Sequence, residues 1–329
     1  MKFLFLLLLI ALSFPFYSQS QDSGLAGKTI ILDAGHGGTA LTDKFRVGPT
    51  GEREEWINLR VALILQNLLE ARGARVIMSR VSDENVLLSK RAELAKENEA
   101  DLFLSIHHNA TADPEVNFPI IYFHGNTSEN KASVLLARKI ADALLNNFFE
   151  PSTPVSIASD YTIFSNSGTA VLRNTYGIPG VIAEASFFTN PSEEKLLKDP
   201  VHNRKEALAY LAAIEAFFKE DRLPILEKNS LVDLPPFDTF QEAERLTEQA
   251  LSWYQDCKQA KELMKSGNSQ NLEKAYDLFT RSARSFPDSF VAAESHMRRA
   301  EILYILGKEE QAKIAALRAQ EYFATLEVK

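Results

Sequence analysis

The sequence between Thr29 and Gly38 reads TIILDAGHGG, an apolar run that stops at an acid, a histidine and three glycines. The run is short, mostly β-branched and without polar alternation, which predicts a strand buried on both faces of an α/β sheet. In open α/β sheets, ligands collect beyond the carboxyl ends of the strands, and the glycines allow a sharp backbone turn beside His36. The stretch therefore predicts a site where His36 reaches a ligand or a metal. A buried strand followed by a glycine turn with a surface histidine is the alternative interpretation.

Predicted strands and helices alternate after this first strand. Short apolar runs predict further strands at 75–78, 101–106, 120–123 and 180–183. Helical apolar periodicity predicts helices at 54–71, 87–98, 130–149 and 190–218, the last with Ser192 as its N-cap. Residues 151–167 are rich in Pro, Ser and Thr and are predicted to form a loop. This order predicts a three-layer αβα sandwich with a mainly parallel sheet.

The chain changes character near residue 223. Residues 223–236 contain three prolines and few periodic apolar positions, which predicts a linker between a domain at 21–222 and a second domain at 237–329. Amphipathic helices are predicted beyond it at 242–264, 271–285, 289–306 and 309–326. Similar segments recur 37 residues apart, at Ala275 and Ala312, which resembles a tetratricopeptide repeat with its period of ~34. We expect an all-α, tetratricopeptide-like domain, with an ordinary helical bundle as the alternative.

Residues 1–20 are typical of a secretory signal peptide. Lys2 precedes an apolar segment at 3–16, and Ser18 and Ser20 provide small residues for cleavage. The apolar segment is short for a membrane span and no charged stop follows it, so no retained membrane helix is expected. Cleavage would change the formal net charge from −8 to −9, and an acidic exported protein is a poor candidate for nucleic-acid binding. We expect export to the periplasm or cell envelope, or secretion.

Four ionisable residues lie where predicted strands end or a helix begins. They are His36, Glu54, His107 and Glu184. Because the carboxyl ends of parallel strands point the same way, these side chains can converge in one crevice. Cys257 is the only cysteine, so any metal must be held by histidines and carboxylates. Two imidazoles and one carboxylate leave an open coordination position, which is typical of a catalytic zinc site.

Five stretches of the sequence together carry a family resemblance. They are ILDAGHGG at 31–38, EEWINL at 54–59, LEARG at 69–73, SIHHNA at 105–110 and IAEASFFTNP at 182–191. Over residues 28–219 the chain resembles the zinc-dependent N-acetylmuramoyl-L-alanine amidases of the cell-wall amidase type 3 family. The resemblance implies Zn²⁺ ligation by His36, Glu54 and His107, with Glu184 as catalytic acid/base. It implies hydrolysis of the amide bond between the lactyl group of N-acetylmuramic acid and L-alanine in peptidoglycan.

Each assignment has an alternative. Glu52 and Glu55 flank Glu54, but only Glu54 stands four residues ahead of the Asn58-Leu59 pair, as the family's ligand does. His108 adjoins His107 on a strand end, where successive side chains face opposite ways, so the two are not expected to bind one ion. Without its strand-end position and the family match, Glu184 would be interpreted as a paired structural carboxylate.

Further expectations concern neighbouring residues and partners. Asp33, Ser105 and Asn109 are expected either to orient the metal ligands or to cap turns. Three other histidines, His124, His202 and His296, match no motif and are interpreted as surface or hydrogen-bonded core residues. A zinc peptidase acting on peptidoglycan stem peptides is the alternative function, because the same ligands would serve it. The helical domain is expected to dock a protein partner, since repeat hairpins commonly present a groove.

Overall fold

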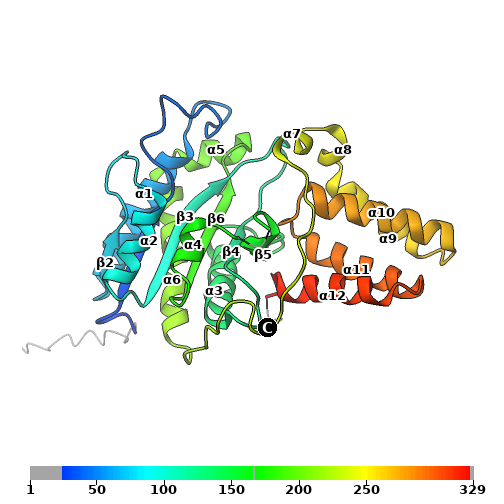
Figure 1. The fold of residues 1–329 in the computed structure, drawn as a ribbon. Helices are drawn as coiled ribbons and strands as arrows, with labels where there is room; N and C mark the ends of the chain where they lie inside the picture. Colours follow the sequence, from blue (N-terminus) through cyan, green and yellow to red (C-terminus); the bar gives the residue numbers. More distant parts are fainter. Residues whose placement is uncertain (1–23, 166, 327–329) are drawn as a thin grey trace, which may run out of the picture.

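The computed structural model describes residues 24–165 and 167–326, so the predicted signal peptide lies outside the described residues. A seven-stranded sheet forms its centre, in the order β2-β1-β3-β6-β4-β5-β7 (Figure 1). The strands are β1 (Thr29–Ala34), β2 (Arg75–Met78), β3 (Leu102–Asn109), β4 (Ile120–Phe123), β5 (Ser156–Ser159), β6 (Gly180–Phe187) and β7 (Phe323–Ala324). Strand β4 pairs antiparallel with β6, and β7 with β5, while the other pairings are parallel. The predicted mainly parallel α/β sheet is confirmed.

Helices cover both faces of the sheet, because successive side chains of a strand point to opposite sides. Ile30 and Leu32 of β1 face one core, and Ile31 between them faces the other. The first core is closed by α1 (Glu54–Glu70), α3 (Lys131–Asn147) and α6 (Pro200–Phe218). The second face carries α2 (Leu88–Glu97), α4 (Ala170–Asn174) and the C-terminal helices (Figure 1).

The C-terminal region is all-helical up to its last strand. Its elements are α7 (Glu242–Arg245), α8 (Glu248–Leu251), α9 (Trp253–Met264), α10 (Ser269–Ser285), α11 (Ala292–Ile305) and α12 (Glu309–Glu321). From α9 onward each helix packs against the next one in the sequence. Strand β7 then returns the chain to the sheet and pairs with β5. The region therefore begins and ends beside the α/β sheet.

Aromatic residues join the C-terminal helices to the sheet in one hydrophobic core. The ring centroid of Phe118 lies 5.3 Å from Phe187, which ends β6, and 5.9 and 5.1 Å from Phe286 and Phe290, which lie between α10 and α11. Trp253 of α9 packs on the same two C-terminal rings, at 4.9 and 5.5 Å. The two regions are therefore expected to unfold together.

Replacing Phe118 with alanine tests this shared core. We expect a loss of about 3–5 kcal/mol in the free energy of unfolding, because a ring that is 2 % exposed leaves a cavity. Unfolding in denaturant is followed by tryptophan fluorescence, to which Trp253 contributes, and by far-UV circular dichroism. Both signals should show the same single transition, at a lower denaturant concentration than in wild type. Phe45→Ala is the control, since that ring is 82 % exposed. Separate transitions for the two signals would contradict the shared core.

The segment before the C-terminal helices is hydrogen-bonded to Glu129 of the sheet domain. Glu129 is fully buried, and its carboxylate accepts hydrogen bonds from the backbone N–H groups of Asn229, Leu231 and Val232. The Glu129 carbonyl accepts another from the N–H of Leu226. Residues 226–232 are therefore held against the domain.

Several predicted elements differ from the observed ones. Residues 151–167, predicted as a loop, contain β5 and the 3₁₀ turn η1 (Asp160–Thr162), because hydrogen bonds to β4 form a strand without an apolar pattern. The predicted helix 190–218 divides at Pro200 into α5 (Pro191–Leu197) and α6. The cap of α5 is Asn190, not Ser192, since its side chain accepts the N–H groups of Ser192 and Glu193. Every helix within the described residues is too short or too polar to cross a bilayer.

Candidate metal centre

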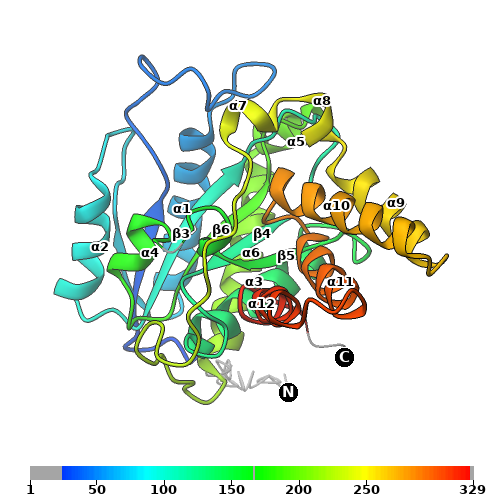
Figure 2. The same ribbon diagram turned by 45° about the vertical axis from the view of Figure 1, so that its right-hand side comes forward.

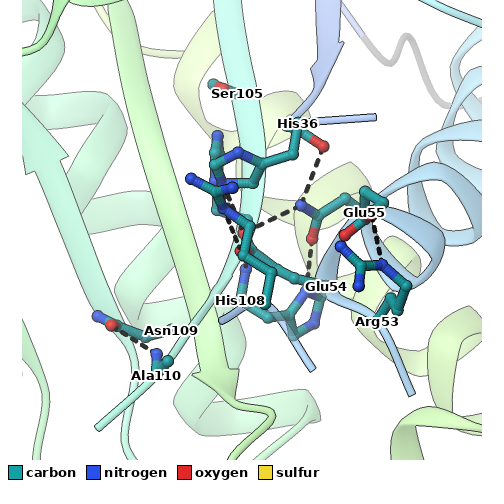
Figure 3. A network of polar contacts seen from close by, with 12 residues as sticks. His36, Arg53, Glu54, Glu55, Ser105, His108, Asn109 and Ala110 are labelled. Atoms are coloured by element: carbon teal, nitrogen blue, oxygen red, sulfur yellow. Dashed lines mark hydrogen bonds and ion pairs between the residues drawn. The ribbon is translucent and has the colours of Figure 1, made fainter. Parts of the chain in front are cut away.

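Three side chains from distant parts of the chain meet at the carboxyl end of β1 and β3. The Nε2 atom of His36 lies 3.2 Å from Oε1 of Glu54 (Figure 3). The Nδ1 atom of His107 lies 3.0 Å from the same oxygen. The two imidazole centroids are 4.7 Å apart. One ligand atom from each residue falls within 4.8 Å of the others, so the group can hold a metal ion. His36 follows β1 and Glu54 begins α1, as predicted. His107 was predicted to follow a strand that ends at residue 106, but it lies within β3, which runs to Asn109.

The backbone around His36 is shaped to bring its ring to this point. His36 has a φ of 57°, in the left-handed region that non-glycine residues rarely adopt. Gly35, just before it, has no room for a side chain, because a Cβ there would lie 2.3 Å from Nε2 of His107. The His107 ring therefore lies directly on the Gly35 backbone. The glycine is required for the approach of the two histidines.

The three groups also set one another's charge. Burial raises the pKa of Glu54, but the neighbouring His36 and His107 lower it to well below its usual range. Burial lowers the pKa of His36, and Glu54 only partly opposes this, whereas the hydrogen bond to Glu54 raises the pKa of His107 despite its burial. The Asn58 amide donates to Oε1 of Glu54 at 3.2 Å and fixes the carboxylate. Glu54 is therefore an anion held between two imidazoles.

Glu184 lies beside the three residues, on β6. It is the register partner of His107 on β3, so it falls within the strand and not after its end as predicted. Together with His36 and His107 it lines a cleft of about 980 Å³, here called the central cleft. Its Oε2 atom is buried and has no hydrogen-bond partner among the described residues. Burial raises the pKa of Glu184 to about 7, although the charge of His107 opposes the rise.

Asp33 and Ser105 contact the site through Arg91, not through the rings of the histidines. The Ser105 hydroxyl donates to one oxygen of Asp33 at 2.7 Å, and Arg91 donates to the other at 2.6 Å. Arg91 also donates to the carbonyls of Ala34 and His36, at 2.8 and 2.5 Å. Asp33 and Ser105 therefore help to hold the backbone of the loop that carries His36, and this replaces the expected role in orienting the ligand side chains. Asn109 caps its own turn through the N–H of Ala110, 2.8 Å away.

His108 points away from His107, as predicted from the alternation of side chains. Its Nδ1 lies 2.8 Å from Oδ1 of Asn58, and its Nε2 lies 3.1 Å from the buried carboxylate of Glu206. Both partners accept hydrogen bonds, and Glu206 raises the pKa of His108 although burial opposes this. Because both ring nitrogens are engaged, His108 supports Asn58 and therefore Glu54.

The other candidate residues have partners elsewhere. Glu52 pairs with Arg60 at 2.8 Å, and Glu55 pairs with Arg53 at 2.6 Å (Figure 3). Each of the three remaining histidines has a polar partner: Asp160 for His124, Glu193 for His202 and Arg299 for His296. The Nε2 atom of His124 is buried and has no hydrogen-bond partner among the described residues. Asn58 and Arg91 were not predicted as site residues. The four-residue spacing of Asn58 from Glu54 is the only sequence signal that points to either.

Comparison with known proteins places this geometry in a family. The chain is 30% identical over 207 residues to the "Probable cell wall amidase LytH" of Staphylococcus epidermidis, covering 63% of this chain and 64% of that protein. It is 29% identical over 241 residues to the "Germination-specific N-acetylmuramoyl-L-alanine amidase" of Bacillus subtilis, covering 67% of this chain and 94% of that protein. The chain thus spans less than two thirds of the length of the staphylococcal relative.

A solved structure agrees with this assignment. The CwlD amidase from Clostridioides difficile, solved in complex with the GerS lipoprotein, superimposes with a TM-score of 0.51 at 27% identity, covering 59% of this chain and all of that chain. The family model described as N-acetylmuramoyl-L-alanine amidase matches residues 30–216, more than half of the chain. The residues that gather around Glu54 all lie within this match. The chain therefore belongs to the N-acetylmuramoyl-L-alanine amidase family (Amidase 3).

Proposed function

We propose that the chain hydrolyses the amide bond between the lactyl group of N-acetylmuramic acid and L-alanine in peptidoglycan. The observation that carries this proposal is the convergence of His36, Glu54 and His107 within 4.8 Å, with Glu184 lining the central cleft beside His36 and His107. Family membership supplies the bond that is cleaved. In this proposal the three converging residues hold Zn²⁺ and Glu184 is the general acid/base.

The donor set fits zinc. Two imidazole nitrogens and one carboxylate oxygen are a common ligand set for catalytic zinc, and they leave a coordination position for water or substrate. Glu54 carries a full negative charge and Asn58 fixes its orientation, which favours a cation at this point. A zinc ion bound there would polarise the scissile carbonyl and lower the pKa of a water molecule toward ~7.

The proton steps fall to Glu184. Its Oε2 has no partner among the described residues, so it is free to accept a proton from the attacking water. A pKa of about 7 suits a group that must take up a proton and then release it at neutral pH. Glu184 would return this proton to the amine of L-alanine as the C–N bond breaks. The products are the lactyl carboxylate on the glycan and a peptide with a free amino terminus.

The rest of the chain has proposed roles as well. We place the signal peptide at 1–20, the catalytic domain at 21–222, the linker at 223–236 and the tetratricopeptide-like region at 237–329. The sequential packing of α9 to α12 supports the repeat-like interpretation, and such hairpins commonly bind protein partners. Family membership implies an extracytoplasmic location, and periplasm, cell envelope and secretion are the proposed destinations.

Product analysis tests the function directly. Purified chain loaded with zinc is incubated with soluble muropeptides, and the products are identified by mass spectrometry. A free lactyl carboxylate together with an intact stem peptide is the expected result. Shortened peptides that remain attached to the glycan would identify a zinc peptidase instead. Removal of the metal with a chelator should abolish cleavage, and readdition of Zn²⁺ should restore it.

A further inference from the structure

The C-terminal helical region forms one wall of the central cleft. The sheet domain contributes Tyr122 and Glu184 to this cleft, and the helical region contributes Phe240, Arg245 and Asp288. Figure 2 shows the segment before α7 rising in front of the sheet. Thr239 and Phe240 of this segment line the cleft, as does Phe164 of the sheet domain. The helical region lies outside residues 30–216, which match the family model. This wall is therefore an addition to the family domain.

Arg245 is the guanidinium of this cleft that remains available to a ligand. Arg91 is occupied by Asp33 and by backbone carbonyls, and Arg46 forms ion pairs with Asp43 and Glu54. Among the described side chains, Arg245 has no carboxylate within 4.0 Å, and its one hydrogen bond runs from Nε to the Phe240 carbonyl at 2.9 Å. That bond fixes the half-buried side chain and leaves both terminal nitrogens free to donate.

A buried acceptor faces the same cleft. Asp288 is 4 % exposed and accepts a hydrogen bond from the Tyr122 hydroxyl on Oδ2, while its Oδ1 has no partner among the described residues. Arg245, Asp288 and Tyr122 line the same cleft. Burial raises the pKa values of Asp288 and Tyr122, and the charge of Arg245 opposes both shifts. Buried polar atoms without a partner are rare, and one in a cleft wall is available to a ligand.

The substrate chemistry decides what Arg245 would meet. In the bond of the proposed function, the lactyl carboxyl group of the glycan is tied up as an amide and carries no charge. The carboxylates of the substrate are therefore on its peptide half, together with backbone N–H donors. A guanidinium with two free nitrogens matches a carboxylate through paired, charge-assisted hydrogen bonds. The unpartnered Oδ1 of Asp288 can accept an N–H of the same peptide.

We propose that the helical region builds a subsite for the peptide half of the substrate, in which Arg245 binds a carboxylate of the stem peptide. The inference rests on the proposed function for the identity of the substrate. By this inference, the helical region contributes directly to substrate selection inside the cleft. Arg245 is a specificity-determining residue and takes no part in the proton steps.

The test uses the full chain and two forms of one muramyl peptide, with its carboxylates either free or converted to carboxamides. Binding is measured by calorimetry with the peptide half of each form, without the glycan. Wild type is expected to bind the peptide with free carboxylates about 10-fold more tightly than the peptide with carboxamides. Arg245→Gln should reduce this ratio to about 1 and raise KM for the free-acid substrate about 10-fold, with kcat close to wild type. Arg245→Lys should retain part of the preference, because it keeps the charge but not the planar fork.

Arg298→Gln is the matched control, since Arg298 of α11 pairs with Glu294 and Glu301 away from the cleft. It should keep the wild-type preference. An unchanged preference in Arg245→Gln, or no preference in wild type, overturns the inference. If neither substrate yields a lactyl carboxylate, the proposed function fails, whereas the peptide-binding ratio still decides the role of Arg245. A thermal melt of each variant confirms that it is folded before binding is measured.

Discussion

Replacing Glu184 with glutamine is expected to reduce amidase activity by about 10²–10⁴-fold while leaving the zinc content close to that of wild type. Glutamine has nearly the same shape as glutamate but cannot take up the proton of the attacking water. In the structure Glu184 lies beside His107 across the β3–β6 pair, but it is not in the group whose ligand atoms converge within 4.8 Å. Elemental analysis and initial rates on soluble muropeptides measure the two quantities on the same sample.

Glu54→Gln provides the reciprocal comparison. Glu54 is an anion between two imidazoles, so its neutral replacement should lower zinc content and activity together. If Glu184→Gln lost metal and activity in parallel, Glu184 would move to the ligand set. If Glu54→Gln kept its metal and lost only activity, the two carboxylates would exchange roles. Thermal melts of both apo variants separate these outcomes from a loss of the fold.

Much of the sheet could be predicted because its central strands are recognisable from their own residues, without knowledge of the strands beside them. Strand β1 and the start of β3 are continuous apolar runs that are buried on both faces, and this pattern needs no knowledge of their neighbours. Strand β5 has the sequence SIAS and depends on hydrogen bonds to β4, and the two residues of β7 depend on β5. The antiparallel direction of β4 has no local signal either. Strands that depend on their partners could not be predicted from the sequence.

The same distinction applies to the candidate site. His36, Glu54 and His107 were predicted because each lies in a motif at the end of a strand or the start of a helix, and the structure brings them together. Arg91 lies within α2 without a motif, and its role appears only when the loop carbonyls of Ala34 and His36 come within reach. Arg245 and Asp288 reach the cleft only because aromatic packing joins the helical region to the sheet.

Gly35→Ala is expected to weaken zinc binding by about 10–100-fold without unfolding the protein. A Cβ at this position would lie 2.3–2.6 Å from three ring atoms of His107, closer than nonbonded atoms approach. Those atoms belong to a side chain, so the imidazole can rotate away while β3 keeps its place in the sheet. The moved ring can no longer share one ion with His36 and Glu54. Zinc titration of the apo protein gives the affinity, and a thermal melt of the same sample reports the fold.

Gly180→Ala is the matched control for this change. Gly180 begins β6, and neither glycine has a positive φ, so alanine is allowed by the backbone at both positions. At Gly180 the nearest atom to an added Cβ is the Cβ of Phe103 at 3.4 Å, which is an ordinary contact. Gly180→Ala should therefore bind zinc like wild type. Equal zinc affinity in the two variants would show that the position of the His107 ring against Gly35 does not matter for the metal, and would remove His107 from the ligand set.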